Sequence, residues 1–308
     1  MKPLKVQPGI PALGVQPGLR PAAAVEIAPE GVLAASLPAP GQAPVFAWEP
    51  LPEGVVEPGI ADLNVRTPEA LTSALRAVLG PLPTRNRAVT LVLPDSAIRV
   101  FMLDFDALPQ KSAEALPVLR FRLRKMVPFD VEEASISYQI LSESKTECRV
   151  LAAVLPGPVL AEYEAATRAA GYEPGAVLPA SLAALAGIDS LESVLIANLS
   201  HNELTTVIAN GNDLLLYRAI DLPQDPAQHA AEVQRNIAVA AAYYEDKLHA
   251  RPTRLLYAGS LPLDEFAGWL DDPELPVAEL AARPDTGFVT TTGPMSIAGV
   301  AGALAGAR

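Results

Sequence analysis

The sequence predicts an α/β protein made of two similar lobes, with a small α+β unit inserted into the first lobe. The chain has 308 residues, which is enough for two domains that each bury a core. Three short apolar runs, a helix-type pattern and a further apolar run occur in this order in each half of the chain. A repeated unit of this size indicates two lobes of similar fold.

The composition excludes several classes of function. The chain carries 35 acidic and 23 basic residues, a net charge of -12, which opposes binding to nucleic acid or anionic lipid. Cys148 is the only cysteine, so neither an internal disulfide nor a thiolate metal site is possible. The apolar stretch at 297–305 is much shorter than the roughly 20 residues of a membrane helix, so no direct membrane insertion is expected.

The first lobe is expected to span residues 22–189 and to follow a leader. Residues 1–21 are too rich in proline for a helix or central strand and are predicted to be disordered. Thr67 and Pro68 suit the cap and first position of a helix that ends at Gly80. Predicted strands precede and follow this helix, at residues 22–28, 32–37, 45–48 and 89–93.

The insertion is expected at about residues 95–154. Its predicted elements are a strand at 97–103, a helix at 112–126, and strands at 135–141 and 148–154. Helices at 158–170 and 179–186 are expected to connect the insertion to the second lobe.

The second lobe is expected to span residues 190–308. Asn210 and Gly211 form a strong hairpin signal within three predicted strands at 194–199, 204–209 and 214–220. A long helix at 227–249 and a strand at 254–258 follow, and a helix at about 294–305 can return to the first lobe.

Several motifs of the insertion resemble a known family. The helix and box of residues 116–130 (LPVLRFRLRKMVPFD) precede the strand SYQIL at 137–141, and the motif LPDSA at 93–97 lies upstream. In this order they resemble the PilM family, actin-like cytoplasmic proteins of the type IV pilus inner-membrane assembly platform. The resemblance covers residues 22–305 and extends to the cytoplasmic domain of the type II secretion protein GspL. It implies an actin-like fold of two ribonuclease-H-like lobes.

In the resembled fold, two glycine-containing turns hold the phosphates of a nucleotide, and the first turn is altered in this chain. Glu26 stands for the family's Asp, Ala28 for its glycine and Leu33 for its lysine. Pro29 removes an N–H donor, and Glu30 adds a negative charge that opposes phosphate. The resemblance therefore predicts a weakened anion site.

The second turn and the adenosine region are also altered. Asn198 replaces the family's acid and Ser200 its glycine, while Glu203 is expected to repel phosphate. Of the glycine pair near the adenosine, Gly259 remains and Ser260 replaces the second. These positions predict a degenerate nucleotide site, hence no cofactor, with ATP and Mg²⁺ as the alternative.

No catalytic residue or metal site is expected. Leu178 occupies the position of the family's acidic residue before the interlobe proline, which leaves no carboxylate there to position water. The three histidines, His201, His229 and His249, lack the spacing of metal ligands. The protein is therefore expected not to be an enzyme.

The resemblance implies that the chain binds the N-terminal cytoplasmic segment of a PilN-like membrane protein. The groove between the first lobe and the insertion would hold this segment. The chain would also contact other platform components. It would lie in the cytoplasm and be attached to the inner membrane through its partner. The basic run around Arg122 and Lys125 has two interpretations. It is either part of this docking surface or the solvated face of a helix whose other face carries Leu116, Leu119, Leu123 and Met126. The expected groove walls are Arg120, Arg124, Val127, Pro128, Phe129 and Tyr138.

Two alternative functions remain open from the sequence. An actin-like ATPase would switch the arrangement of its lobes on binding a nucleotide, and intact phosphate-binding turns would favour it. A GspL-like cytoplasmic domain would belong to a type II secretion platform, and its natural chain would continue into a membrane helix of about 20 residues.

Overall fold

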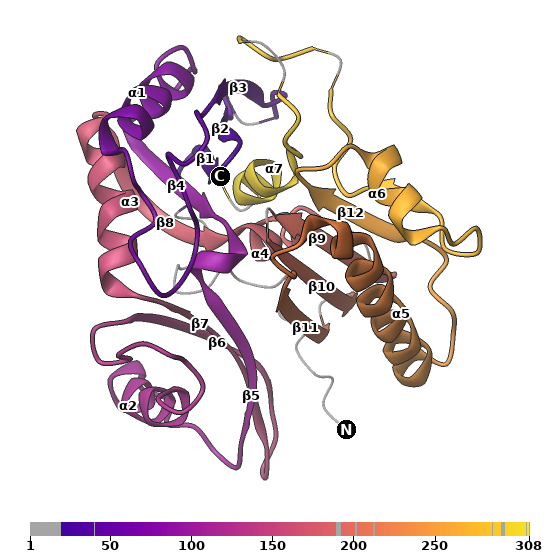
Figure 1. The fold of residues 1–308 in the computed structure, drawn as a ribbon. Helices are drawn as coiled ribbons and strands as arrows, with labels where there is room; N and C mark the ends of the chain where they lie inside the picture. Colours follow the sequence, from indigo (N-terminus) through magenta and orange to yellow (C-terminus); the bar gives the residue numbers. More distant parts are fainter. Residues whose placement is uncertain are drawn as a thin grey trace.

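The computed structural model describes residues 20–39, 41–188, 192–200, 202–211, 213–284, 286–290, 293–305 and 307. Residues 1–19 of the predicted leader (1–21) and His201 lie outside these ranges. Two five-stranded sheets form the centres of the two lobes, and a three-stranded sheet extends from the first lobe (Figure 1).

The sheet of the first lobe has the strand order β3-β2-β1-β4-β8. Strands β1 to β3 form an antiparallel meander, and β4 and β8 add to β1 in parallel. The bounds are β1 (Ala23–Ala28), β2 (Gly31–Ser36), β3 (Val45–Pro50), β4 (Ala88–Leu93) and β8 (Glu173–Pro179). Strand β8 escaped the sequence analysis because its Pro and Gly residues resemble a loop.

The sheet of the second lobe has the order β11-β10-β9-β12-β13 and the same strand directions. The bounds are β9 (Ser193–Ser200), β10 (Glu203–Asn210), β11 (Asp213–Asp221), β12 (Leu255–Gly259) and β13 (Val277–Glu279). The predicted two-lobe architecture is therefore confirmed, and each lobe has one strand more than the sequence indicated.

Helices cover both faces of the first sheet. Helices α1 (Pro68–Leu79) and α3 (Gly157–Ala169) pack together on one face, while α4 (Ala180–Leu185) and α7 (Ala298–Ala305) lie on the other. Helix α7 contacts β1, β2 and β4, so the end of the chain packs on the first lobe (Figure 1).

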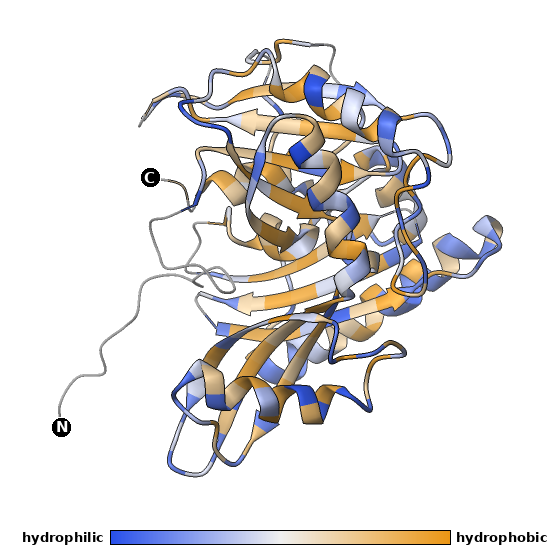
Figure 2. Ribbon diagram, turned by 90° about the vertical axis from the view of Figure 1, so that its left-hand side faces the viewer, coloured by the Kyte–Doolittle hydropathy of each residue, from blue (hydrophilic) through white to orange (hydrophobic). Residues whose placement is uncertain are grey.

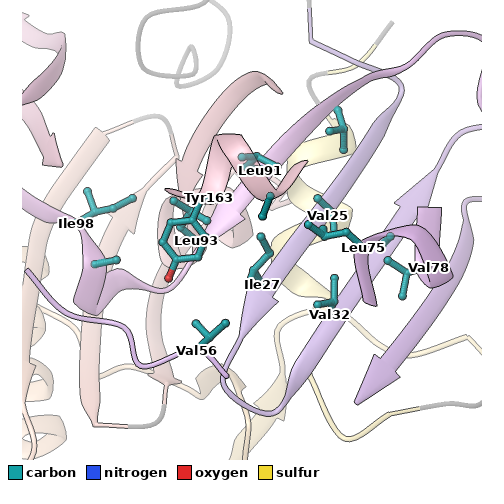
Figure 3. Close-up of a cluster of buried hydrophobic side chains, with 14 of the residues drawn as sticks. Val25, Ile27, Val32, Val56, Leu75, Val78, Leu91, Leu93, Ile98 and Tyr163 are labelled. Atoms are coloured by element: carbon teal, nitrogen blue, oxygen red, sulfur yellow. The ribbon is translucent and has the colours of Figure 1, made fainter. Parts of the chain in front are cut away.

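The apolar stripe of α1 explains its place in the core. Leu71, Leu75, Val78 and Leu79 are fully buried, as their helical spacing requires. They pack with strand residues such as Leu91, as Figure 3 shows for this cluster. Pro68 occupies the start of α1, and the side chain of Thr67 makes no capping hydrogen bond with the described residues.

The second sheet is covered by α5 (His229–Leu248) and α6 (Leu263–Leu270). Val233 and Ile237 of α5 and Phe266 of α6 are buried against it. Helix α5 begins later than predicted because Asp225 caps a short 3-10 turn, η2 (Pro226–Gln228), just before it. Apolar residues concentrate in the strands and on these packed helix faces (Figure 2).

The insertion lies between β4 and α3. After a 3-10 turn, η1 (Asp95–Ala97), its elements are β5 (Arg99–Phe105), α2 (Ser112–Leu123), β6 (Ser135–Glu143) and β7 (Cys148–Leu155). The antiparallel sheet has the order β5-β7-β6, so β6 is an edge strand. Strand β5 begins at Arg99, two residues after the predicted start at residue 97.

Helix α2 packs on one face of this sheet and is shorter than predicted. Ala115, Leu119 and Leu123 are buried in the core of the insertion. Met126, predicted for the buried stripe, is exposed because the α-helix ends at Leu123 and a turn follows.

The two ends of the described chain meet. Arg20 is buried, forms a β-bridge with Ala307, and donates a 3.5 Å hydrogen bond to the carbonyl of Ala303. Phe288 forms a bridge to Phe46 of β3 and stacks on its ring. The first lobe therefore includes Arg20, which the sequence analysis assigned to the leader. From about residue 288 the chain again packs on the first lobe.

Candidate functional site

A small cavity lies between the two lobes, and all seven positions predicted for the degenerate nucleotide site line it. They are Glu26, Ala28, Glu30, Asn198, Ser200, Gly259 and Ser260. The second half of β1 with the turn after it, the end of β9 and the end of β12 supply them. Helices α4 and α7 contribute Ala180, Ala184 and Gly299. The fold thus gathers residues from three separate regions of the sequence at one place.

The cavity at the two turns has little space in this arrangement of the lobes. Its volume is about 30 Å³, close to the space of one or two water molecules. Pockets for small molecules typically measure roughly 300–1,000 Å³. The described residues that line it include two carboxylates and no lysine or arginine. The position expected for the phosphates therefore lacks both space and positive charge, whereas a neighbouring cavity of about 340 Å³, which shares Gly259 and Ser296 with it, is lined by Arg283.

Two backbone donors of residues that line the cavity, Ser260 and Ser296, are already used within the protein. The N–H of Ser260 donates a 3.1 Å hydrogen bond to the carbonyl of Leu199, and the N–H of Ser296 donates one of 3.2 Å to the carbonyl of Gly259. A phosphate-binding turn needs free N–H groups that point at the anion. These two bonds instead connect β12 to β9 and to the segment before α7.

Glu26 points its carboxylate into the packing between β1 and α7. Its Oε2 atom is buried and accepts no hydrogen bond from the described residues. Burial, with repulsion from Asp95 and Glu30, raises the pKa of Glu26 to about 8, and the N–H of Val300 partly opposes this shift. A Cβ atom at Gly299 would collide with this carboxylate. Burial therefore favours the neutral form of the Glu26 carboxyl.

Asp95 is a central polar residue that the sequence analysis did not select. Its Oδ2 accepts a 2.9 Å hydrogen bond from Nδ2 of Asn198, and its Oδ1 accepts bonds from the N–H and hydroxyl of Ser181 at 3.1 and 3.0 Å. The Ser181 hydroxyl also contacts the Tyr217 hydroxyl at 2.8 Å. Burial raises the pKa of Asp95, and these hydrogen bonds oppose the shift. Asp95 thus joins η1, α4 and β9 across the two lobes.

Glu203 has a different position from the one expected. It is 1% exposed and pairs with Arg99 of β5 at 3.1 Å, and Arg99 also contacts Asp221 at 3.5 Å. Burial and nearby Asp95 raise the pKa of Glu203 to about 8, and Arg99 opposes this shift. Its side chain does not line the cavity between the lobes. The expectation that Glu203 repels phosphate is therefore wrong, because the carboxylate turns toward the insertion.

Two residues expected in the partner groove have internal roles. Arg120 donates hydrogen bonds to the backbone carbonyls of Val131, Glu132 and Ala134 and so fixes the loop before β6. Val127 is buried in the core of the insertion. The predicted helix stop therefore contributes to packing, and these two side chains have little surface for a partner.

The other expected groove residues are accessible. Arg124 pairs with Glu132 on the surface, and Pro128 is exposed. Phe129 and Tyr138 are half-buried against the core of the insertion. Tyr138 belongs to β6, whose outer edge has no neighbouring strand among the described residues.

Leu178 and the described histidines have structural surroundings. Leu178 is buried in an apolar cluster with residues of β1 and α7. The ring nitrogen Nε2 of His229 lies 2.8 Å from the carbonyl of Pro223, and His249 ends α5 with a φ of 53°. Within the part of the chain that the structure describes, no group of three or more His, Cys, Asp or Glu residues could hold a metal.

The sequence matches no family model and no curated protein. Solved structures do match. The PilM-PilN type IV pilus biogenesis complex contains a chain with a TM-score of 0.70 and 18% identity, covering 93% of this chain and 98% of that one. The cytoplasmic domain of EpsL, an inner membrane component of the type II secretion system of Vibrio cholerae, has a TM-score of 0.50 and 14% identity, with 90% and 92% covered.

A protein of unknown function from Bacteroides thetaiotaomicron, described as having an actin-like ATPase fold, matches with a TM-score of 0.50 at 13% identity, over 94% of this chain and 96% of that one. These matches cover 90% or more of this chain and therefore span both lobes. The protein therefore has the two-lobed actin-like fold, and its structure is similar to that of PilM.

Proposed function

We propose that the protein is a non-catalytic scaffold of a type IV pilus assembly platform and binds the N-terminal cytoplasmic segment of a PilN-like membrane protein. The cavity between the lobes is the observation that supports this most directly. It has about 30 Å³ of space, two carboxylates and no basic residue among the described ones. Such a cavity disfavours phosphate binding at the two turns, and an actin-like fold can carry functions other than nucleotide chemistry.

The free edge of β6 offers a place for an extended peptide. Alternate residues of β6 (Ser135–Glu143) direct backbone N–H and C=O groups away from β7, where an added strand can pair with them. Phe129 and Tyr138 beside it are only partly buried and supply apolar contacts. Pro128 and Arg124 complete the accessible part of this surface.

In this proposal the partner holds the protein at the inner membrane from the cytoplasmic side. None of the helices in the described part of the chain is long and apolar enough to cross a bilayer. Membrane attachment through a PilN-like protein would give the scaffold its position beside other platform components.

A peptide-binding measurement tests the proposal. Fluorescence anisotropy with the labelled N-terminal segment of a PilN-like protein from the same organism should show saturable binding. Phe129→Ala and Tyr138→Ala should each weaken it about tenfold, which corresponds to about 1.4 kcal/mol. Tyr243→Ala, a half-buried tyrosine on α5, is the matched control and should leave the affinity unchanged. Unchanged affinity in both groove variants would refute the proposed surface.

Nucleotide binding is the competing function, and it is tested separately. A thermal shift assay with millimolar ATP and Mg²⁺ should leave Tm unchanged, since a ligand that does not bind the native state cannot stabilise it. Calorimetry should likewise detect no heat of binding. Micromolar, magnesium-dependent binding of ATP would overturn the non-catalytic assignment.

A type II secretion platform is the second candidate, because the cytoplasmic domain of EpsL shares the fold. The TM-score of 0.70 for PilM against 0.50 for EpsL favours the pilus platform. Co-purification of the natural protein with its membrane partner, followed by identification of that partner, discriminates between the two.

A further inference from the structure

Helix α2 carries apolar residues on two opposite sides. One side, with Ala115, Leu119 and Leu123, is buried against the sheet of the insertion. On the other side Phe121 is 72% exposed and Val118 is 37% exposed. A surface helix normally turns polar residues to the solvent, so an exposed aromatic residue next to an exposed valine indicates a contact surface.

The outer side of α2 has a symmetric pattern. Glu114, Val118, Phe121 and Lys125 follow one another at spacings of four, three and four residues, which places them along one side of the helix. The N–H of Arg124 still bonds to the carbonyl of Arg120, so the helical turn continues to the beginning of Lys125. The order is acid, apolar, apolar, base, and the spacings are the same when the helix is reversed.

This pattern is complementary to itself in an antiparallel pair. Two copies of α2 related by a two-fold axis near the middle of the helix would set Val118 against Phe121 and Glu114 against Lys125, each pair twice. Lys125 forms no ion pair with any described residue, and Glu114 has only a 3.5 Å contact with exposed Lys111. Helix α2 lies at the periphery of the molecule, away from the second lobe (Figure 1).

We propose that the outer face of α2, formed by Glu114, Val118, Phe121 and Lys125, joins two copies of this chain in an antiparallel homodimer. A contact limited to one helix of about 18 Å buries less than the roughly 1,200 Å² of a standard interface, so the dimer is weak and depends on concentration. The proposal is independent of nucleotide binding and of peptide binding at β6.

Sedimentation velocity of the full chain over a range of about 5–500 µM tests the proposal. The wild type should shift from monomer to dimer, and Phe121→Asp should raise the dissociation constant at least tenfold. Val239→Asp, at an exposed valine of α5, is the matched control and should dimerise like the wild type. A wild type that stays monomeric throughout the range overturns the proposal.

A charge exchange tests the antiparallel arrangement itself. Glu114→Lys alone and Lys125→Glu alone each place like charges opposite one another and should weaken the dimer. An equimolar mixture of these two variants should dimerise again, because each charged pair is then of opposite sign. Failure of the mixture to recover excludes this geometry, and binding of monomeric protein to anionic vesicles that Phe121→Asp abolishes would assign the face to lipid instead.

Peptide binding measured on Phe121→Asp separates this proposal from the proposed function. The variant should bind the PilN-like segment as the wild type does, since the mutated side chain lies on α2 and the peptide surface on β6. Loss of peptide binding together with a monomeric wild type would assign the outer face of α2 to the peptide and overturn the dimer.

Discussion

The side-chain amide of Asn198 donates a 2.9 Å hydrogen bond to the buried carboxylate of Asp95, a residue 103 positions earlier in the chain. Asn198 lies near the end of β9 in the second lobe, and Asp95 follows the last residues of β4 in the first. Ser181 at the start of α4 completes the contact. Where a nucleotide site is expected by resemblance, the two lobes are instead connected by polar side chains.

This connection predicts a stability effect at Asn198. Asn198→Ala removes a donor from buried Asp95 and should lower the free energy of unfolding by about 1–3 kcal/mol. Asn198→Asp, which restores the acid of the resembled family, should cost more at pH 8 than at pH 5, because two neighbouring carboxylates repel only when both are charged. Urea denaturation at the two pH values measures both effects.

Asn210→Ala serves as the control for this prediction. Asn210 accepts a hydrogen bond from Ser193 at an exposed position, so its loss should change stability by less than about 0.5 kcal/mol. Equal losses at positions 198 and 210 would contradict a special role for the buried connection.

Glu26 and Glu203 predict that stability falls as the pH rises. Both have a folded-state pKa of about 8, above the ordinary 4.5, so the folded protein holds more protons than the unfolded chain between these values. Their contribution is complete below about pH 4.5 and is lost by about pH 8, and it amounts to several kcal/mol, because each tenfold change in proton affinity corresponds to about 1.4 kcal/mol. Urea midpoints at pH 5, 6, 7 and 8 measure it.

The double variant Glu26→Gln, Glu203→Gln isolates these two groups from all others. Since glutamine does not titrate, the stability of the wild type relative to the variant should fall between pH 5 and pH 8. The size of this fall is the contribution of the two carboxyl groups. Parallel pH profiles for both proteins would show that the two pKa values are not raised.

The ion pair of Arg99 and Glu203 predicts that replacing one partner lowers the stability of the folded protein and that replacing both partners recovers it. At pH 9, where the Glu203 carboxyl is charged, Arg99→Leu leaves it without its cation and should cost about 3 kcal/mol. Arg99→Leu combined with Glu203→Leu should recover most of this. As the control, Arg149→Leu removes the surface ion pair with Asp104 and should lower the free energy of unfolding by less than about 1 kcal/mol. Thermal unfolding of the four proteins tests the order.

The contact between Gly299 and Glu26 predicts coupling between α7 and β1. Gly299→Ala places a methyl group against the Glu26 carboxylate and should destabilise the protein by about 1–3 kcal/mol. Glu26→Ala should reduce that loss, which a double-mutant cycle detects. At Gly302 the obstacle is the backbone carbonyl of Ala183, so Gly302→Ala should destabilise the protein whether or not Glu26 is present.

The strand and helix patterns were enough to predict most of the local structure. The buried stripe of α1 at Leu71 and Leu75 and the hairpin at Asn210 and Gly211 depend on side-chain periodicity and turn geometry, which neighbouring residues encode. Strand β8 and helix α6 were missed, since β8 contains Pro and Gly and is held by its parallel partner β4. Long-range pairing, and not local preference, makes β8 a strand.

The sequence alone determined the two-lobed fold, the insertion and the seven positions that line the cavity. Only the tertiary structure decided how the charges act. The position of Glu203 in the sequence, next to the second turn, predicts a place near the phosphates. Side chains of a strand point alternately to its two faces, however, and that of Glu203 points to Arg99 of the insertion. Asp95 becomes important because folding brings Ser181 and Asn198 to it and removes water, and burial in turn raises its pKa.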